Sequence, residues 1–403
     1  MTSAGGVEPG GVPFDQDPGR WRALAVVSAA LLLGMSGWFT AAAVAPDLSV
    51  RWGFTASQVG WLTTLVQLGF VVGTALAAVL NLADVVPSRW YFAASALGAA
   101  AANAALLVAP GFGTALVTRF LTGMFLGGVY PPGMKMIATW FRSARGLAIG
   151  TVVGALTVGK ATPYLLKAAG GASTEPVVLG ASAAGVMAAL LVAGLYRTGP
   201  YPFERRPFSW GMIGRILRHR ETMLATGGYL GHMWELYAMW TWVPAFLLAA
   251  ARSGGGPSEG WVELVSFGAI AAGGAGCVWG GWAADRVGRA RVVNLAMTLS
   301  GLCAVSVGWM LAAPFWVLAV VTWVWGFFVV ADSAQFSAMV TEVAPSHAVG
   351  TALTLQTSLG FLLTMATIQA VPLLAAMGWG WAFAFLAWGP AAGIASIRRM
   401  RRG

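Results

Sequence analysis

Long apolar stretches follow one another along almost the whole of this 403-residue chain, and only short polar connections separate them. Each stretch is about 18–25 residues long, enough for a helix to cross the roughly 30 Å hydrocarbon core of a bilayer. Backbone groups in lipid need partners within the protein, so only helices and closed barrels span membranes. The apolar runs are continuous and do not alternate with period two. The sequence therefore predicts an all-α membrane protein.

Twelve membrane-spanning helices are expected in two halves of six. The expected spans are 22–45, 58–80, 90–109, 112–138, 147–168, 177–196, 222–250, 259–283, 291–312, 315–341, 349–373 and 376–397. The longest polar connection, 197–221, is rich in proline and arginine and is expected to link an N-terminal bundle, 22–196, to a C-terminal bundle, 222–397. Residues 1–21 and 398–403 are expected to be cytoplasmic tails, the first of them disordered.

The charge distribution indicates how the chain is oriented and which functions it excludes. Only 9% of the residues are charged, and the formal net charge is +10. The arginines gather in alternate connections and in the C-terminal tail, as the positive-inside rule predicts for cytoplasmic loops. We therefore expect a multi-pass protein of the inner (plasma) membrane with both termini in the cytoplasm, and no nucleic-acid partner. The sequence contains no catalytic constellation, metal-ligand spacing or nucleotide loop, so it predicts no enzyme, metal site or cofactor.

The two halves repeat short motifs, which indicates an internal duplication. Three pairs recur at nearly one offset: Asp84 with Asp285, 145–148 with 349–352, and Gly123 with Gly326. Internal repeats are common in secondary transporters, whose substrate sites lie near the bilayer midplane between the repeats. The duplication therefore supports two pseudo-symmetric bundles around a central site.

A charged turn between two apolar runs, at 281–291, carries the most specific motif of the chain. It consists of Gly281, Asp285, Arg286, Gly288, Arg289 and Arg291. A second pattern, Arg119-x-x-x-Gly123-x-x-x-Gly127, lies in the fourth span. Both patterns resemble those of the major facilitator superfamily, and the resemblance covers nearly the full chain. It implies a transporter, usually monomeric, that rocks two helical bundles about a central site.

The sequence departs from the family pattern in two places. The first copy of the loop motif keeps Asp84, but Pro87 stands where glycine is usual. In the fifth span Lys160 follows Gly159, where the export-associated motif of the family has proline. This second departure weighs against a proton-antiporting drug exporter.

The two aspartates of the loop motif are expected to act as gate latches. Partial positive charge at a helix N-terminus favours a nearby carboxylate. The resemblance places Asp285 against the helix that begins near Gly146, and Asp84 against the helix that begins near Gly350. The alternative is a tight turn whose arginines only anchor the loop on the cytoplasmic side.

Three cations inside the first half are candidate substrate-binding residues, because ionisable groups within membrane spans are costly and usually functional. Lys160 lies near the middle of the fifth span and can hold an anion or form an ion pair with a neighbouring span. The guanidinium of Arg119 can bind an oxyanion through two hydrogen bonds, or it can instead support proton coupling or the structure. Lys135 follows a double proline and can line the cavity or extend to the membrane surface.

The seventh and tenth spans carry the candidate proton-coupling residues, Glu235, His232 and Asp332. His232 and Glu235 lie three positions apart on nearly one helix face. The aromatic residues beside them, including Trp234 and Tyr237, are further candidate binding residues. The alternative for His232 and Glu235 is a hydrogen-bonded pair that only packs helices. For Asp332 the alternative is neutralisation of a cation across the bundle.

These residues favour a transporter that moves a small organic or inorganic anion into the cell with protons. Three cationic candidates in the first half indicate the anion, and acidic groups in the second half indicate the proton. A proton-coupled exporter of amphipathic compounds is the nearest alternative, since the chain is rich in aromatic residues and methionine. A membrane sensor that transports nothing is the alternative of another class.

Overall fold

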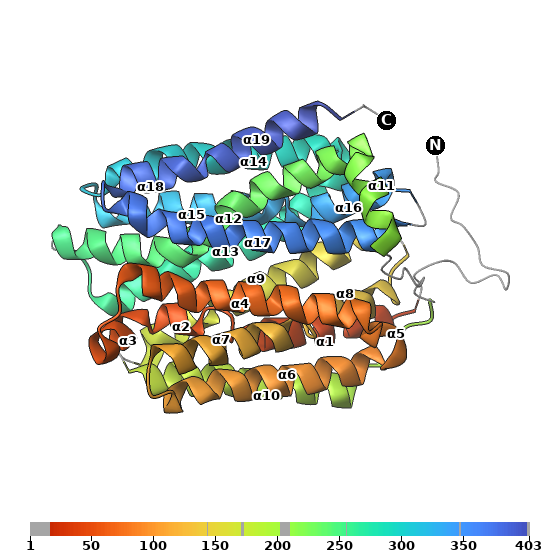
Figure 1. The fold of residues 1–403 in the computed structure, drawn as a ribbon, viewed down its shortest axis with the longest axis horizontal. Coiled ribbons are helices and arrows are strands. Elements are labelled where there is room, and N and C mark those ends of the chain that lie inside the picture. The colour runs from red at the N-terminus through yellow and green to blue at the C-terminus, as the bar shows by residue number, and fades with distance from the viewer. Residues whose placement is uncertain are drawn as a thin grey trace.

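The computed structural model describes residues 17–142, 144–170, 173–201, 210–254, 256–345 and 348–400. Within these ranges the chain forms helices and short connections and contains no strand. The side chains of Asp84 and Arg145 lie outside the described residues. The long helices run roughly parallel to the long axis of the molecule, which is horizontal in Figure 1.

The first half of the chain forms one layer, drawn in red to yellow-green in Figure 1. Its elements are α1 (Gly19–Gly34), α2 (Thr40–Ala43), α3 (Ala45–Trp52), α4 (Ala56–Val79), α5 (Leu82–Val85), α6 (Ser88–Ala104), η1 (Ala105–Val108), α7 (Phe112–Leu126), α8 (Tyr130–Ala138), α9 (Arg145–Gly170) and α10 (Thr174–Leu195). Helix α1 packs on α9 and α10, α6 packs on α7 and α10, and α4 packs on α7.

The second half forms the layer above it, drawn in green to blue. Its elements are η2 (Trp210–Met212), α11 (Ile213–Arg218), α12 (Arg220–Ser253), α13 (Glu259–Val287), α14 (Arg289–Val307), η3 (Gly308–Met310), α15 (Phe315–Ala331), α16 (Ser333–Val343), α17 (Val349–Ala375), α18 (Trp379–Leu386) and α19 (Trp388–Arg398). Helix α12 packs on α17 and α19, and α13 packs on α15.

Local sequence signals account for the helix ends. The hydroxyl of Thr55 caps α4 by accepting a hydrogen bond from the backbone N–H of Gln58. In turn, the side-chain oxygen of Gln58 accepts a hydrogen bond from the backbone N–H of Thr55. His219 caps α12 in the same way through Thr222. Gly288 has φ of +89°, which allows the sharp break between α13 and α14. The charged turn is thus compact because glycine stands at its corner.

Ten helices within the described ranges are long and apolar enough to cross a membrane. They are Ala56–Val79, Ser88–Val108, Phe112–Ala138, Gly146–Ala169, Thr174–Leu195, Glu259–Val287, Arg289–Met310, Phe315–Val343, Val349–Ala375 and Trp379–Arg398. Helix α1 is only 16 residues long, because the expected span 22–45 breaks into a turn at 35–39. Helix α12 has 34 residues, but its polar residues lower its hydropathy. The structure confirms a multi-helix membrane protein, and the number twelve stays a prediction.

The two halves meet along two helix pairs, α9 with α13 and α4 with α17. Glycines bring α9 and α13 into backbone contact. A Cβ atom on Gly154 would lie 2.7 Å from the carbonyl oxygen of Gly274, and one on Gly150 would lie 2.9 Å from that of Cys277. Small residues at helix interfaces in membranes let backbones approach closely. Within the glycine-rich run 273–276, Gly274 therefore packs against α9 of the other half, whereas Gly276 packs against α15 of the same half.

Replacing Gly154 by valine should weaken this contact. The added side chain must push α9 away from α13, and overpacking of this kind costs about 1–3 kcal/mol. The thermal unfolding midpoint of the purified protein should fall. Gly194→Val is the matched control, since a Cβ atom on Gly194 meets nothing within 4 Å. Equal midpoints for the two variants would contradict the close packing of the halves.

Candidate functional site

An aromatic cage around Lys160 occupies the centre of the molecule. Lys160 lies on α9 and is 4% exposed. Its ammonium Nζ donates a hydrogen bond to Tyr237 Oη at 2.5 Å. The same Nζ lies 4.3 Å from the ring centroid of Trp38, 4.8 Å from that of Tyr237 and 5.3 Å from that of Trp240. These distances allow cation–π attraction to all three rings.

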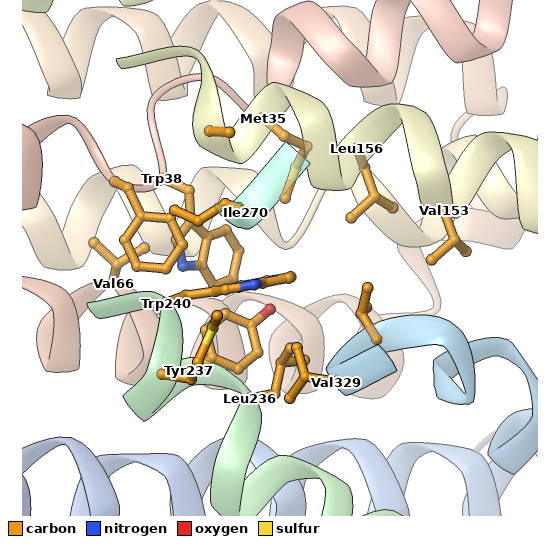
Figure 2. Close-up of a cluster of buried hydrophobic side chains, with 14 of the residues drawn as sticks. Met35, Trp38, Val66, Val153, Leu156, Leu236, Tyr237, Trp240, Ile270 and Val329 are labelled. Carbon is orange, nitrogen blue, oxygen red and sulfur yellow. The ribbon is translucent and has the colours of Figure 1, made fainter. Parts of the chain in front are cut away.

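Two features of the first half place Lys160 and Trp38 together. A side chain at Gly159 would overlap the carbonyl of Leu32, so only glycine lets α9 approach α1 this closely. Trp38 lies in the turn between α1 and α2. Figure 2 shows Trp38, Tyr237 and Trp240 gathered in one cluster.

Arg119 holds the turn that carries Trp38. Its guanidinium donates to the backbone carbonyl oxygens of Gly37 and Trp38, both at 2.7 Å, and to Asn103 Oδ1 at 2.8 Å. Arg119 is fully buried and is absent from the lining of the central cavity. Of the roles considered for it from the sequence, this geometry fits the structural one.

A cavity of about 60 Å³ adjoins the cage. Residues of α8, α9, α12, α15, α16 and α17 line it, and Lys160, Tyr237 and Trp240 form part of its wall. The rest of the lining includes apolar side chains and six residues that carry hydroxyl groups, Tyr130, Thr157, Tyr229, Ser333, Ser337 and Thr357. The lining includes no aspartate or glutamate. The cavity thus combines one cation with several hydroxyls.

Lys160 has no carboxylate at ion-pair distance within the part of the chain that the structure describes. Buried charges in proteins are normally paired or hydrogen-bonded. Here the rings and one phenol oxygen are the only compensation that the described residues offer. The ammonium therefore gives the cavity a positive potential.

The three acidic and imidazole candidates on the second half separate into two sites. Glu235 accepts hydrogen bonds from Trp325 Nε1 at 2.6 Å and from Ser300 Oγ at 2.9 Å. These partners lie on α15 and α14, so the carboxyl faces away from the cavity. The predicted pair of His232 and Glu235 does not form, because His232 bonds to a different carboxylate.

His232 Nδ1 lies 2.8 Å from Asp332 Oδ1. Both side chains are buried. Asp332 immediately precedes Ser333, which lines the cavity, and the His232 ring centroid lies 6.1 Å from that of the cavity residue Tyr229. The pair thus lies directly behind the cavity wall. Among the described residues, the side chain that faces Asp332 is thus an imidazole of the same half and not a lysine or arginine across the bundle.

Two further candidates lie away from the cavity. Trp234 points to α18, where its Nε1 donates to the carbonyl oxygen of Phe385 at 3.2 Å. Lys135 is half-buried near the end of α8. Neither residue lines the central cavity. The structure therefore brings together only Lys160 and Tyr237 of the five predicted substrate-binding residues.

The charged turn lies against the other half. A Cβ atom on Gly146 would lie 2.6 Å from Asp285 Oδ2, so the carboxylate is seated at the first turn of α9. Its negative charge meets the positive end of the helix dipole there. Arg286 lies over the ring of Trp282 at 4.0 Å. Arg289 donates to Glu342 Oε1 and Gln335 Oε1, both at 2.8 Å, and ties the turn to α16.

A second contact closes the opposite end of the same helix pair. Lys167 Nζ on α9 lies 3.3 Å from Glu263 Oε1 on α13 and donates to the carbonyl oxygen of Ala43 at 2.9 Å. A cavity of about 270 Å³ opens beside it, with Tyr164, Trp242 and Glu263 in its wall. Sequence reasoning missed this pair. The available signal was a pair of opposite charges: Lys167 near the end of the fifth span and Glu263 near the start of the eighth, which lie on the same side of the membrane.

Comparisons with known proteins agree with this architecture. The sequence is 34% identical over 161 residues to the puromycin resistance protein pur8 of Streptomyces alboniger, an alignment that covers 40% of this chain and 31% of that protein. The fold is similar to the crystal structure of a mutant of the nucleoside transporter NupG, with a TM-score of 0.73 and 13% sequence identity. That match covers 95% of this chain and 100% of the other.

The sequence pattern of one family covers most of the chain. Residues 26–362 match the sequence model of the Major Facilitator Superfamily. This match includes the charged turn, the aromatic cage and the helix pair of α9 with α13. The protein therefore belongs to the major facilitator superfamily.

Proposed function

We propose that the protein is a secondary transporter that carries a small anion into the cell together with protons. Family membership indicates a membrane transporter rather than an enzyme. The observation that supports an anionic solute is Lys160, a buried ammonium group without a carboxylate partner among the described residues, at the wall of a hydroxyl-lined cavity. An anion in this cavity would supply the charge that the surrounding residues lack.

Alternating access would use the two closures at the ends of α9 and α13. Asp285 closes the end predicted to be cytoplasmic, and the pair of Lys167 with Glu263 closes the other. Both contacts join the first half to the second, so each must break when the halves rock apart at that end. The anion would enter after the outer pair opens and leave after Asp285 releases α9.

Proton coupling would use the pair of His232 and Asp332. The pair lies on the second half, while Lys160 lies on the first. Protonation changes the charge of this pair directly behind the cavity wall and so changes the potential that the anion meets. Glu235 is the second candidate proton carrier, because both of its oxygens accept hydrogen bonds from neutral donors and no cation pairs with it among the described residues.

Export of amphipathic compounds is a second candidate function. The partial similarity to a puromycin resistance protein favours it, as do the aromatic walls of the cage. The charge of the cavity favours the anion. Counterflow in proteoliposomes separates the two: labelled acetate or nitrate should exchange in the first case, and a lipophilic dye should be expelled from cells in the second.

Replacing Lys160 by glutamine should lower anion uptake by at least about tenfold, because the only cation in the cavity lining is lost. Uptake of labelled acetate and nitrate into proteoliposomes measures the effect. Lys160→Arg keeps the charge and is the matched control, with activity between that of the glutamine variant and wild type. Equal uptake by wild type and the glutamine variant would rule out a binding role for Lys160.

Replacing Asp332 by asparagine should abolish accumulation driven by a proton gradient and leave anion exchange intact. The asparagine cannot hold the charge that pairs with His232. Uptake with and without an imposed pH gradient measures the first step, and counterflow measures the second. Glu235→Gln in the same assays tests the other candidate. Loss of exchange along with accumulation would assign the altered residue a binding or structural role.

Replacing Glu263 by glutamine should open the outer cavity. Removing one partner of a largely buried ion pair leaves the other charge uncompensated and destabilises the closed state. A cysteine introduced at Ser49, in the wall of that cavity, should react several-fold faster with a membrane-impermeant maleimide. Glu259→Gln is the matched control, because Glu259 pairs with Arg252 on the exposed surface of the same helix end. Equal labelling rates in the two variants would exclude the outer latch.

A further inference from the structure

We propose that the indole N–H groups of Trp38 and Trp240 bind the anion together with the ammonium of Lys160, and that this set of donors selects small, singly charged oxyanions. The inference rests on the proposed transport of an anion and names its class. It also gives the two tryptophans a role beyond their cation–π contact with the lysine.

The first observation concerns unpaired donors. Trp38 and Trp240 are each 1% exposed, and the Nε1 atom of each has no hydrogen-bond partner among the described residues. A buried tryptophan N–H usually finds a partner. Other tryptophans follow this rule, with backbone or carboxylate oxygens accepting from Trp140, Trp234, Trp242, Trp323 and Trp325. In the part of the chain that the structure describes, the two exceptions are the two indoles of the Lys160 cage.

The second observation concerns their position. Trp240 lines the cavity directly, whereas Trp38 stands behind the lining, with its ring 5.7 Å from that of the lining residue Tyr237, centroid to centroid. Tyr237 in turn lies 5.3 Å from Trp240. The cage therefore collects two indole N–H donors around an ammonium that has three N–H groups and gives one of them to Tyr237. The ammonium and indole N–H groups only donate, and the hydroxyls of the lining can donate as well as accept, so together they fit a ligand that only accepts hydrogen bonds.

Charge and size narrow the ligand class. Lys160 is the single cation in the cavity lining, so a doubly charged anion would keep one negative charge uncompensated. The cavity volume of about 60 Å³ has room for about four to six small heavy atoms or water molecules, since one water needs about 10–15 Å³ on this measure. Nitrate, formate and acetate have the right charge and few enough heavy atoms. Sulfate and dicarboxylates carry one charge too many.

Arg119 is a positioning residue in this arrangement. It binds the carbonyls of Gly37 and Trp38 and thereby sets the turn from which the Trp38 indole extends. Its guanidinium is occupied by those bonds and by Asn103, so its charge does not enter the cavity. Arg119, the cation of the fourth span, thus orients the neutral indole N–H donor of Trp38.

Calorimetric titration of the purified full-length protein with sodium nitrate and sodium acetate tests the proposal. Trp38→Phe and Trp240→Phe keep an aromatic face toward Lys160 and remove one N–H each. Each variant should raise the Kd by about tenfold or more, as expected for a hydrogen bond to a charged group. Trp323→Phe is the matched control, because its N–H bonds to the carbonyl of Val265 outside the cavity. Sodium sulfate and succinate should bind at least about tenfold more weakly than nitrate or acetate.

The outcomes separate this inference from the proposed function. Unchanged nitrate and acetate affinity in both phenylalanine variants, with normal binding by wild type, would overturn the role of the indoles and leave anion transport standing. Equal affinity for sulfate and nitrate would overturn the selection for single charge. Failure of every anion to bind wild type would reject the proposed function itself. If a phenylalanine variant does not fold, incorporation of benzothienylalanine, which replaces the indole N–H by sulfur, gives the same comparison.

Discussion

The ammonium group of Lys160 imposes the central constraint on this structure, because a charge buried among apolar helices must be compensated by whatever surrounds it. Here the compensation comes from the faces of aromatic rings and one phenol oxygen. Lys160 and Trp38 belong to the first half of the chain, and Tyr237 and Trp240 belong to the second. The cage is therefore complete only while the two halves meet around it, so their relative motion changes the environment of the charge.

The helix that carries Lys160 also carries the contacts by which the halves close. Helix α9 receives Asp285 at its first turn, meets the glycines of α13 along its length and pairs through Lys167 with Glu263 near its last turn. Lys160 lies between these closures. Under the proposed alternating access, opening either end would move α9 against α13, and the lysine would move with it. Binding of an anion at Lys160 is thus positioned to favour one arrangement of the halves over another.

The sequence predicted those features that depend on the free-energy cost of burying a group in lipid or on the spacing of residues along the chain. The apolar runs indicated the helical membrane fold, and the expense of a charge in lipid identified Lys160, Glu235 and Asp332. What the sequence could not predict were contacts between distant positions. Trp38 meets Lys160 through a turn that no periodicity marks, and His232 bonds to Asp332 rather than lying beside Glu235. The polar residues of α12 do not gather on one face, so no polar stripe showed that Tyr237 faces the cavity while Trp234 faces α18.

The charge of Lys160 also bears on which property of a resistance protein can be proposed for this chain. A cationic solute entering the cavity would meet the like charge of Lys160, and the cavity lining contains no carboxylate to offset that repulsion. Under the proposed function, an anionic solute would instead be attracted to Lys160 at the same position. The aromatic content that favours a drug exporter in the sequence has a different use here. The rings of Trp38, Tyr237 and Trp240 surround Lys160, a cation of the protein itself. In the proposed function, the solute would supply the negative charge that Lys160 lacks.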